Sequence, residues 1–430
     1  MTDSAETIHE LVQVVVDSQG VSIDTRDDLN GKVFWALKGP RFNANDFVDH
    51  ALEAGAFHVV SDESRWADTP RVTVVEDGLA SMQDVAREVR RRWTCPVIAL
   101  TGSNGKTTSK ELMRDVLATR FRVHATRGNL NNHIGVPLTL LNAPERPDVV
   151  IVEMGANHQR EIDFLCEIAE PNHGYITNIG LAHLEGFGGE HGVYLGKKEL
   201  FDWLGANGGT AFVLTSDAKV VEAAKPLTKV LHVDTEGWEW RAAKGTDRPQ
   251  LCDNTGQCWS LHLEGQYNLA NCLAAVTIGQ HFGVPKDMAM QAVSNYRPEN
   301  HRSQVMETER NWVLLDAYNA NPSSSQAAMD AFAAKGHGSP LLIMGDMAEL
   351  GDASLDAHQR IIDLALEHGV ELWTIGPWFG KARQATQSDH PHFDAVDDLM
   401  DSSLLSGLSN RQILIKGSRS MALEQLMPAL

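Results

Sequence analysis

The sequence predicts an α/β protein of three domains, spanning residues 1–93, 94–297 and 298–430. With 430 residues, the chain exceeds the usual size of one hydrophobic core, for which about 150 residues per domain is a guide. Apolar strands alternate with helical patterns along most of the chain, which is typical of parallel sheets covered on both faces. Breaks at Pro96 and around Pro298 interrupt this alternation and suggest the boundaries.

The first domain is predicted to be a small α/β unit. Short apolar strands at 33–37, 57–60 and 72–75 are separated by turn residues, and residues 47–54 have a helical pattern. Residues 81–93 repeat apolar side chains at helical spacing and lead into Pro96. This helix is therefore expected to connect the first domain to the second.

The central domain is predicted to contain a parallel sheet like that of P-loop ATPases. Its alternating strands and helices are expected at 97–100, 110–119, 149–152, 161–169 and 175–177. The Trp- and Gly-rich residues 235–260 suggest an antiparallel excursion, and a helix is expected at 269–282.

The third domain is predicted to be a Rossmann-like α/β unit. Its strands are expected at 312–315, 341–344, 372–375 and 412–415. Residues 298–302, which precede this series, are a candidate hinge, and a rigid spacer is an equally good interpretation.

Composition excludes several classes of function. The 37 basic and 57 acidic residues give a formal charge of −20, which repels polyanions and argues against nucleic-acid binding. The five cysteines are scattered and are expected to be reduced thiols. No apolar stretch reaches the roughly 20 residues of a membrane span, and the acidic start lacks the features of a secretory signal. We therefore expect a cytoplasmic protein without membrane insertion.

A phosphate-binding loop is the clearest motif. The sequence Thr101-Gly102-Ser103-Asn104-Gly105-Lys106-Thr107-Thr108 follows an apolar strand and precedes a helix, so its backbone N–H groups would face a phosphate chain. Lys106 would contact the β- and γ-phosphates of ATP, and Thr107 would ligate Mg²⁺. Leu100 occupies the usual position of the first glycine. The alternative interpretation is an ordinary strand-to-helix turn that contains Gly-Lys-Thr.

Three further residues are candidates for the same site. Glu153 follows a buried strand, so its carboxylate would emerge at the edge of the sheet where ligands collect, as a possible Mg²⁺ ligand. His183 lies in the loop after another strand, where a structural role is an alternative. Lys197 by itself has the pattern of a surface lysine on a helix.

Together these residues resemble the central domain of the Mur ligases, which build the peptide of bacterial cell-wall precursors. The resemblance rests on the phosphate loop, on 153–156, on 178–183 and on Lys197. Further segments resemble the member of the family that adds a dipeptide, and they are residues 22–26, 34–39, 128–137, 316–322, 345–351 and 416–419. They follow one another in the order of that family across nearly the whole chain.

The resemblance implies roles for individual residues. Lys106, Lys197, His183 and Glu153 would be catalytic, and the metal would be held by Thr107, Glu153, His183 and Lys197, the last as a carbamate. A carbamate is an anion and can hold a cation. ATP would be bound by Gly102, Ser103, Asn104, Gly105, Lys106, Thr107, Thr108, Asn268, Asn271, Arg302, Asp316 and Asn321. The UDP-sugar substrate would be bound by Ser22, Thr25, Arg26, Asn129 and Asn132.

Two positions depart from the pattern of the family. Tyr267 stands where relatives carry His, so we assign it no role. The turn Pro298-Glu299-Asn300-His301-Arg302 lacks the usual glycine, so the role of Arg302 rests on the arginine and its spacing.

The resemblance also implies the reaction. A carboxylate of UDP-N-acetylmuramoyl-tripeptide would attack the γ-phosphorus of ATP with Mg²⁺ present, and the amine of D-Ala-D-Ala would then attack the acyl phosphate. We expect a monomer whose first, second and third domains hold the nucleotide sugar, ATP and the amine. The alternatives are the ligase that adds the third amino acid, a ligase that extends folate with glutamate, and, from a different class, a P-loop switch or motor NTPase.

Overall fold

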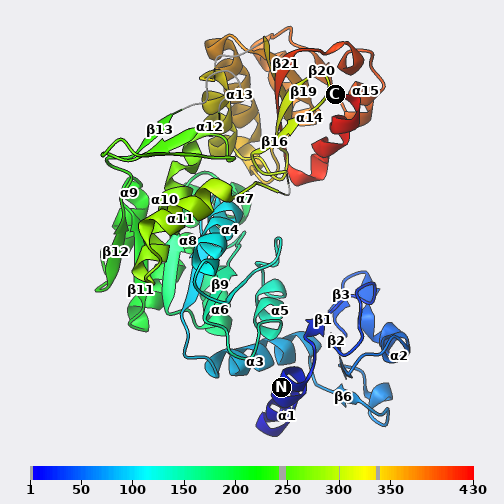
Figure 1. Ribbon diagram of the computed structural model, residues 1–430. Helices are drawn as coiled ribbons and strands as arrows, with labels where there is room; N and C mark the ends of the chain where they lie inside the picture. The colour runs from blue at the N-terminus through cyan, green and yellow to red at the C-terminus, as the bar shows by residue number, and fades with distance from the viewer. Residues whose placement is uncertain (1–2, 242–247, 300, 336–338) are drawn as a thin grey trace.

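The computed structural model describes residues 3–241, 248–299, 301–335 and 339–430. Figure 1 shows three bodies in a row, with the blue N-terminal part at one end, the cyan to yellow part in the middle and the orange to red part at the other end. Each body contains its own β-sheet of four or six strands. The predicted α/β class is therefore confirmed, and the boundaries after residues 93 and 297 stay predictions.

The N-terminal body contains a small parallel sheet with the strand order β1-β2-β5-β6. The bounds of its elements are α1 (Ala5–Asp17), β1 (Val21–Ser22), β2 (Val33–Trp35), β3 (Lys38–Gly39), β4 (Phe42–Asn43), α2 (Val48–Glu53), β5 (His58–Ser61), β6 (Val72–Val74) and α3 (Gly78–Arg91). The predicted strands and the connecting helix are all present. The indole N–H of Trp35 donates to the Gly78 carbonyl at 2.7 Å, which ties β2 to the start of α3.

Helix α3 joins the N-terminal body firmly to the central one. Its apolar face and that of α1 belong to the same continuous hydrophobic core as one face of the central sheet. The buried Arg90 donates to the carbonyl oxygens of Ala169 and Glu170 at 2.9 and 2.7 Å. At the other side of the junction, Asn142 exchanges two hydrogen bonds of 3.0 and 2.9 Å with the backbone of Val21. Core packing and polar contacts together fix the relative position of these two bodies.

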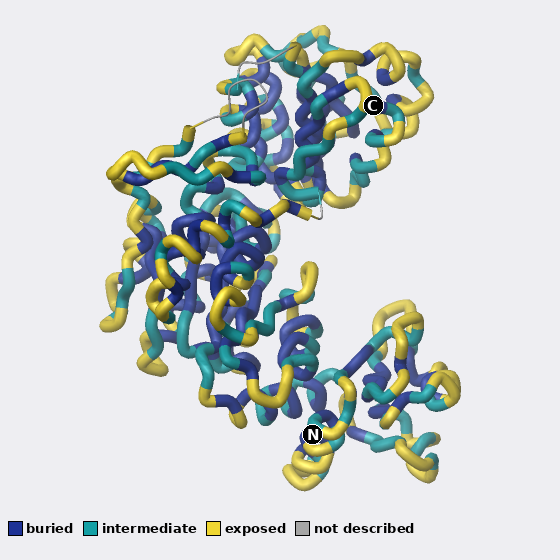
Figure 2. Tube along the Cα trace, viewed as in Figure 1, coloured by how far each residue is buried: buried dark blue, intermediate teal, exposed yellow. Residues whose placement is uncertain are grey.

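The central body is built on a six-stranded, fully parallel sheet with the order β12-β11-β10-β7-β9-β8. Its elements are β7 (Val97–Thr101), α4 (Lys106–Ala118), β8 (Val123–Ala125), α5 (Gly135–Leu141), β9 (Val149–Glu153), α6 (Glu161–Ala169), β10 (His173–Ile176), α7 (Leu184–Phe187), α8 (Glu190–Ala206), β11 (Thr210–Leu214), α9 (Ala218–Ala224), β12 (Val230–Val233), α10 (Leu269–His281) and α11 (Lys286–Asn295). Separate hydrophobic clusters cover the two faces of this sheet, and Figure 2 shows the buried interior in dark blue.

Helix α4 begins four residues earlier than the sequence pattern suggested, at Lys106 instead of residue 110. The prediction relied on apolar periodicity, whereas the first turn of α4 is made of Lys, Thr and Ser side chains. Gly105 precedes the helix with a φ of 77° and provides the left-handed residue from which the helix starts. The phosphate loop therefore leads directly into a helix N-terminus.

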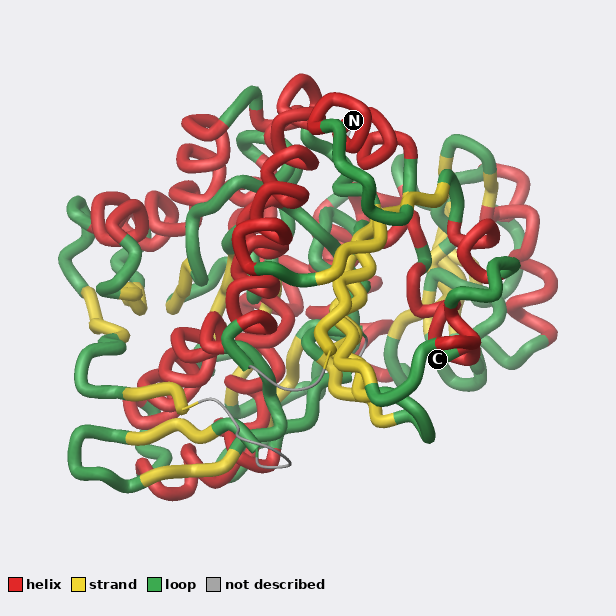
Figure 3. The backbone as a smooth tube through the Cα atoms, turned by 90° about the horizontal axis from the view of Figure 1, so that it is seen from above, coloured by secondary structure: helices red, strands yellow, loops and turns green. Residues whose placement is uncertain are grey.

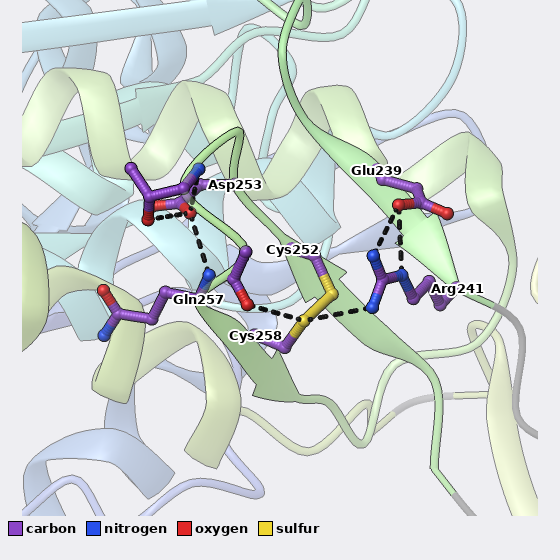
Figure 4. Close-up of a disulfide and its surroundings, with 8 residues drawn as sticks. Glu239, Arg241, Cys252, Asp253, Gln257 and Cys258 are labelled. Carbon is purple, nitrogen blue, oxygen red and sulfur yellow. Dashed lines mark hydrogen bonds and ion pairs between the residues drawn. A yellow bond between two sulfur atoms is a disulfide. The ribbon is translucent and has the colours of Figure 1, made fainter.

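The antiparallel excursion is present as a small sheet of β13 (Glu239–Arg241), β14 (Gln250–Cys252) and β15 (Cys258–Ser260). Here the expectation of five reduced thiols is wrong, because Cys252 and Cys258 form a disulfide (Figure 4). The antiparallel register places the two residues directly opposite each other, with their Cα atoms 4.1 Å apart. The other three cysteines are free.

The C-terminal body contains a second six-stranded sheet, with the order β16-β17-β21-β18-β19-β20. Only the edge strand β16 is antiparallel to its neighbour. Its elements are β16 (Gln304–Glu307), β17 (Trp312–Asp316), α12 (Pro322–Ala333), β18 (Ser339–Gly345), α13 (Ser354–His368), β19 (Glu371–Ile375), α14 (Pro377–Thr386), β20 (His392–Phe393), α15 (Val396–Met400) and β21 (Arg411–Lys416). Apolar clusters lie on both faces, and Figure 3 shows helices beside the strands near the C-terminus.

The candidate hinge at 298–302 includes residue 300, which lies outside the described residues. Its role as a hinge or as a spacer therefore stays a prediction. Among the residues described, none of the helices combines the length and the apolar character that crossing a bilayer requires.

Candidate active site between the central and C-terminal bodies

The phosphate loop is held in place by the end of the neighbouring strand β10. The backbone N–H groups of Ser103 and Asn104 donate to the carbonyl and side-chain oxygens of Asn178, both at 3.0 Å. Gly102 has a φ of 145°, and a Cβ atom there would lie 2.0 Å from the Thr177 hydroxyl. Because only glycine fits this position, the loop can approach β10 closely.

Lys106 directs its ammonium group back toward the loop. Its Nζ donates to the carbonyl oxygens of Gly102 and Ser103 at 2.6 and 3.4 Å. Burial lowers the pKa of this ammonium to about 8, and the Glu153 carboxylate offsets part of that effect. Lys106 is therefore a cation in a poorly hydrated position, which favours interaction with an anionic ligand.

Glu153 is the centre of a buried polar cluster at the end of β9. Its two carboxylate oxygens accept hydrogen bonds from the Thr107 hydroxyl at 3.1 and 3.0 Å. Asn131 donates to the same carboxylate at 2.9 Å, and the Lys110 ammonium lies 3.2 Å away. Lys110 and Glu153 are both almost fully buried, so their charges compensate each other in a medium where an unpaired charge would be costly.

Sequence reasoning missed Asn131 and Lys110. Asn131 lies between Asn129 and Asn132, the two asparagines predicted to bind the UDP-sugar. Lys110 is four residues after Lys106, a spacing that places both side chains on one face of a helix. This could not be used for prediction, because the helix was expected to start at residue 110 and starts at Lys106. Both residues act on the charge of Glu153.

His183 and Lys197 approach the same region from other elements. His183 precedes α7 with a φ of 53°, and its Nδ1 atom contacts the carboxylate of Glu349 from the C-terminal body. Lys197 is a buried residue of α8 that donates to the Ala156 carbonyl at 3.3 Å and lies 5.0 Å from the centre of the Phe187 ring. Burial, with the nearby charge of Lys106 acting in the same direction, holds the pKa of the Lys197 ammonium well below its usual range. It is therefore not the surface lysine that its sequence pattern alone suggested.

Asn268 and Asn271, which were predicted to bind ATP, form a polar pair beside the loop. Asn271 donates to the Asn268 side chain at 2.8 Å and accepts a hydrogen bond of 3.0 Å from the Ser109 hydroxyl. A Cβ atom at Gly105 would lie 2.8 Å from the Asn271 oxygen, so this pair packs directly on the loop.

The C-terminal body contributes the opposite wall. Asn321, which caps α12, donates to the side chain of Asn104 in the loop at 2.7 Å. The Arg302 guanidinium lies over the Tyr318 ring at 3.5 Å, and the Lys416 ammonium pairs with Asp316 at 2.6 Å. The predicted nucleotide residues of the two bodies are thus brought together.

Many of these residues line one cavity of about 1230 Å³ between the two bodies, whereas Gly102 and Lys197, both predicted for the site, do not. Its lining includes almost all predicted residues of the central and C-terminal bodies, namely Ser103, Asn104, Gly105, Lys106, Thr107, Thr108, Asn129, Asn132, Glu153, His183, Asn268, Asn271, Arg302, Asp316 and Asn321. Tyr267, to which the sequence assigned no role, also lines it. The tyrosine hydroxyl bonds to Ser303 at 2.8 Å, so it takes part in the junction of the two bodies.

The family of the chain follows from comparison with known proteins. A model of the Mur ligase middle domain matches residues 100–279, and one of the Mur ligase glutamate ligase domain matches residues 301–419. The UDP-N-acetylmuramoyl-tripeptide–D-alanyl-D-alanine ligase of Bacillus subtilis is 31% identical over 426 residues, covering 95% of this chain and 92% of that protein. The chain belongs to the Mur ligase family. The Escherichia coli enzyme of the same name is 32% identical over 98% of the chain and 95% of its own length.

Comparison with solved structures supports this family assignment. A crystal structure of MurF from Acinetobacter baumannii matches this Mur ligase with a TM-score of 0.82 and 28% identity, covering 100% of this chain and 98% of that one. MurF of Thermotoga maritima, solved in complex with ADP, matches with a TM-score of 0.84 over 97% of both chains at 24% identity, which supports the fold.

The predicted nucleotide-sugar residues of this Mur ligase lie apart from the cavity. Ser22, Thr25 and Arg26 belong to the N-terminal body, and none of them is among the cavity-lining residues. The Ser22 hydroxyl donates to Asp27 at 2.6 Å. Arg26 is exposed, and its guanidinium and backbone N–H donate hydrogen bonds to the Asp24 carboxylate. These hydrogen bonds lower the pKa of the Asp24 carboxyl to about 2. A substrate that contacts both places must therefore be long.

The donor set around Glu153 fits a hard divalent cation. Within the described residues, no three His, Cys, Asp or Glu side chains gather into a metal-binding group. The Thr107 hydroxyl and the Glu153 carboxylate lie side by side at the cavity, and both are oxygen donors of the kind that Mg²⁺ prefers. Mg²⁺ commonly completes its octahedron with water and substrate phosphates, so two protein oxygens are sufficient.

Proposed function

We propose that this Mur ligase joins D-alanyl-D-alanine to UDP-N-acetylmuramoyl-tripeptide in an ATP-dependent, ADP-forming reaction of peptidoglycan precursor synthesis. The observation that supports it most is the cavity between the central and C-terminal bodies, where the loop cation Lys106 and the oxygen pair of Thr107 and Glu153 face side chains of the third body. The names of relatives that align over nearly the whole chain support the choice of substrates.

The reaction has two steps. A carboxylate oxygen of the tripeptide attacks the γ-phosphorus of ATP. The bond between that phosphorus and the β,γ-bridging oxygen breaks, so that ADP departs and the tripeptide carries an acyl phosphate. The amine of D-Ala-D-Ala then attacks the acyl carbon, loses a proton and expels inorganic phosphate. Peptide-bond formation is thus driven by cleavage of ATP.

The residues of the cavity serve positioning and charge neutralisation. Lys106 and the loop N–H groups neutralise the charge that spreads over the transferring phosphoryl group. Thr107 and Glu153 would hold Mg²⁺, which supplies further neutralisation of the phosphate oxygens. Asn321 and Arg302 bring the C-terminal body against the nucleotide, and this closure excludes the water that would hydrolyse an acyl phosphate.

Lys197 and His183 complete the proposed site. Burial lowers the pKa of Lys197 and so favours its neutral amine, which is the form that reacts with CO₂ to give a carbamate. The resulting anion would provide one more oxygen ligand for a cation.

Ser22, Thr25 and Arg26 would hold the uridine diphosphate, while Asn129 and Asn132 at the cavity would contact the remainder of that substrate. The use of ATP favours a cytoplasmic location, and we propose a monomer.

A coupled assay of ADP release tests this function. ADP should appear in proportion to product only when ATP, Mg²⁺, UDP-N-acetylmuramoyl-tripeptide and D-Ala-D-Ala are all present, and a panel of tripeptides with diaminopimelate or lysine identifies the third residue. Phosphate release without an amine acceptor would instead indicate a P-loop switch NTPase. Turnover with a single amino acid or a folate as substrate would indicate one of the other ligases.

A further inference from the structure

The loop at 346–351 of the C-terminal body meets helix α7 of the central body. Its Glu349 carboxylate contacts Nδ1 of His183, the residue that precedes α7. Two residues further on, Gly351 adopts a φ of 54°, and a Cβ atom there would come within 3.4 Å of the Glu185 side chain. The two chain segments are therefore packed against each other, in addition to the contact between the charged groups.

The loop is held rigidly from behind by its own body. The Met347 N–H donates to Nε2 of the buried His358 at 3.0 Å, and the Ala348 N–H donates to the Ser418 hydroxyl at 2.7 Å. Asp346 accepts hydrogen bonds of 3.0 Å from the first backbone N–H groups of α14. Glu349 follows these anchored residues with a φ of 62°, and its side chain is half-exposed.

The other partner, His183, lines the cavity together with Lys106 and Glu153. A carboxylate at Nδ1 favours the tautomer that carries its proton on Nδ1, which leaves the lone pair of Nε2 available to a ligand. Histidines that bind metals commonly have such a carboxylate partner at the second nitrogen. The pair of Glu349 and His183 brings the same two groups into contact from different bodies, although Nδ1 makes no hydrogen bond of acceptable geometry in this structure.

We propose that Glu349 is a positioning residue that orients His183 toward the active site when the C-terminal body closes. The inference rests on the proposed function, because it assigns His183 to the Mg²⁺ and nucleotide site. The contact joins two bodies, so it exists only when they are together. Closure would then complete the site itself as well as exclude water, and an open enzyme would hold the metal more weakly.

A second contact between the same bodies provides a matched control. Lys335 of the C-terminal body pairs with Glu264 of the central body at 2.8 Å, and both side chains are largely buried. Neither residue lines the cavity. Glu264→Gln therefore removes one carboxylate from the same junction without affecting His183.

The test uses the full-length wild type, Glu349→Gln, Glu349→Asp and Glu264→Gln. Mn²⁺ binding in the presence of ADP is measured by electron paramagnetic resonance, and kcat and KM are measured by ADP release. Because loss of an outer partner commonly reduces metal affinity or activity by 10- to 100-fold, we expect Glu349→Gln to weaken Mn²⁺ binding and to lower kcat by about tenfold each. The KM for ATP should change little, and Glu349→Asp should recover part of both losses. Glu264→Gln should stay within about twofold of the wild type in both measurements, because neither residue of its pair lines the cavity.

Equal effects of Glu349→Gln and Glu264→Gln would overturn the proposal, because Glu349 would then be an ordinary contact between the bodies. Unchanged Mn²⁺ affinity in Glu349→Gln would overturn it as well. Failure of the proposed function has a different signature, since wild-type enzyme would then release no ADP in response to D-Ala-D-Ala. In that case the Mn²⁺ measurement still reports on the positioning of His183.

Discussion

The depressed pKa of Lys106 leads to a quantitative prediction about nucleotide binding. In the ligand-free protein the pKa of this ammonium is about 8, mainly because of burial. As the pH rises through 8, Lys106 loses its positive charge. Binding of a phosphate chain then requires protonation of the amine, which reduces the free energy of binding. Affinity for ADP should therefore be nearly constant below pH 7 and fall at higher pH.

The magnitude follows from the protonated fraction of Lys106. With a pKa of about 8, roughly nine-tenths of the molecules carry the ammonium at pH 7 and roughly one-tenth at pH 9, so the Kd for ADP should rise about tenfold, which corresponds to about 1.4 kcal/mol. Isothermal titration calorimetry at pH 7, 8 and 9 measures this directly. Proton uptake on binding, seen as a dependence of the heat on the buffer, should be largest above pH 8.

Lys106→Arg is the matched variant, because a guanidinium stays charged throughout this range. Its Kd should be independent of pH between 7 and 9, whereas Lys106→Ala should bind ADP weakly at every pH and release no ADP in the coupled assay. A Kd that is equally flat in the wild type would refute the argument. A slope that persists in Lys106→Ala would assign the titration to another group.

Three further predictions concern other parts of the molecule. Lys197→Ala should be severely impaired and partly rescued by short-chain carboxylic acids in the ADP-release assay, and full activity without rescue would remove Lys197 from the site. Lys110→Met should lower the thermal unfolding temperature, because it leaves Glu153 as an unpaired buried charge at a cost of about 3–5 kcal/mol, and the added change Glu153→Gln should restore much of the loss. Cys258→Ser should leave kcat and KM unchanged, since neither Cys252 nor Cys258 lines the cavity, and thiol titration before and after reduction should detect two additional thiols in the wild type.

Much of the fold could be predicted from local pattern. Apolar runs such as 149–152 and 412–415 are interior strands of the two large sheets. Strands that are buried on both faces appear in the sequence as continuous apolar runs, which is why they could be predicted. The start of α4 was missed because its first turn is polar and faces the cavity. The disulfide was missed because only the antiparallel register places Cys252 opposite Cys258.

The candidate site also contains residues that local sequence pattern predicts and residues that it does not. The loop and Glu153 could be predicted, since each directly follows an apolar strand. The partners that determine their chemistry could not, because they come from distant parts of the chain: Asn321 is 217 residues from Asn104, and Glu349 reaches His183 from another body. Contacts of this kind depend on how whole bodies pack, which periodicity and spacing do not encode.

The firm attachment of the N-terminal body has a consequence for substrate selection. Because α3 and Asn142 fix that body to the central one, the distance from Ser22 to the phosphate loop is constant. Under the proposed function, a nucleotide sugar bound at Ser22 must therefore reach the γ-phosphate with its peptide. Each residue adds at most about 3.5 Å of reach, so under that function the fixed junction would select for peptide length and leave a precursor one residue too short outside bonding distance.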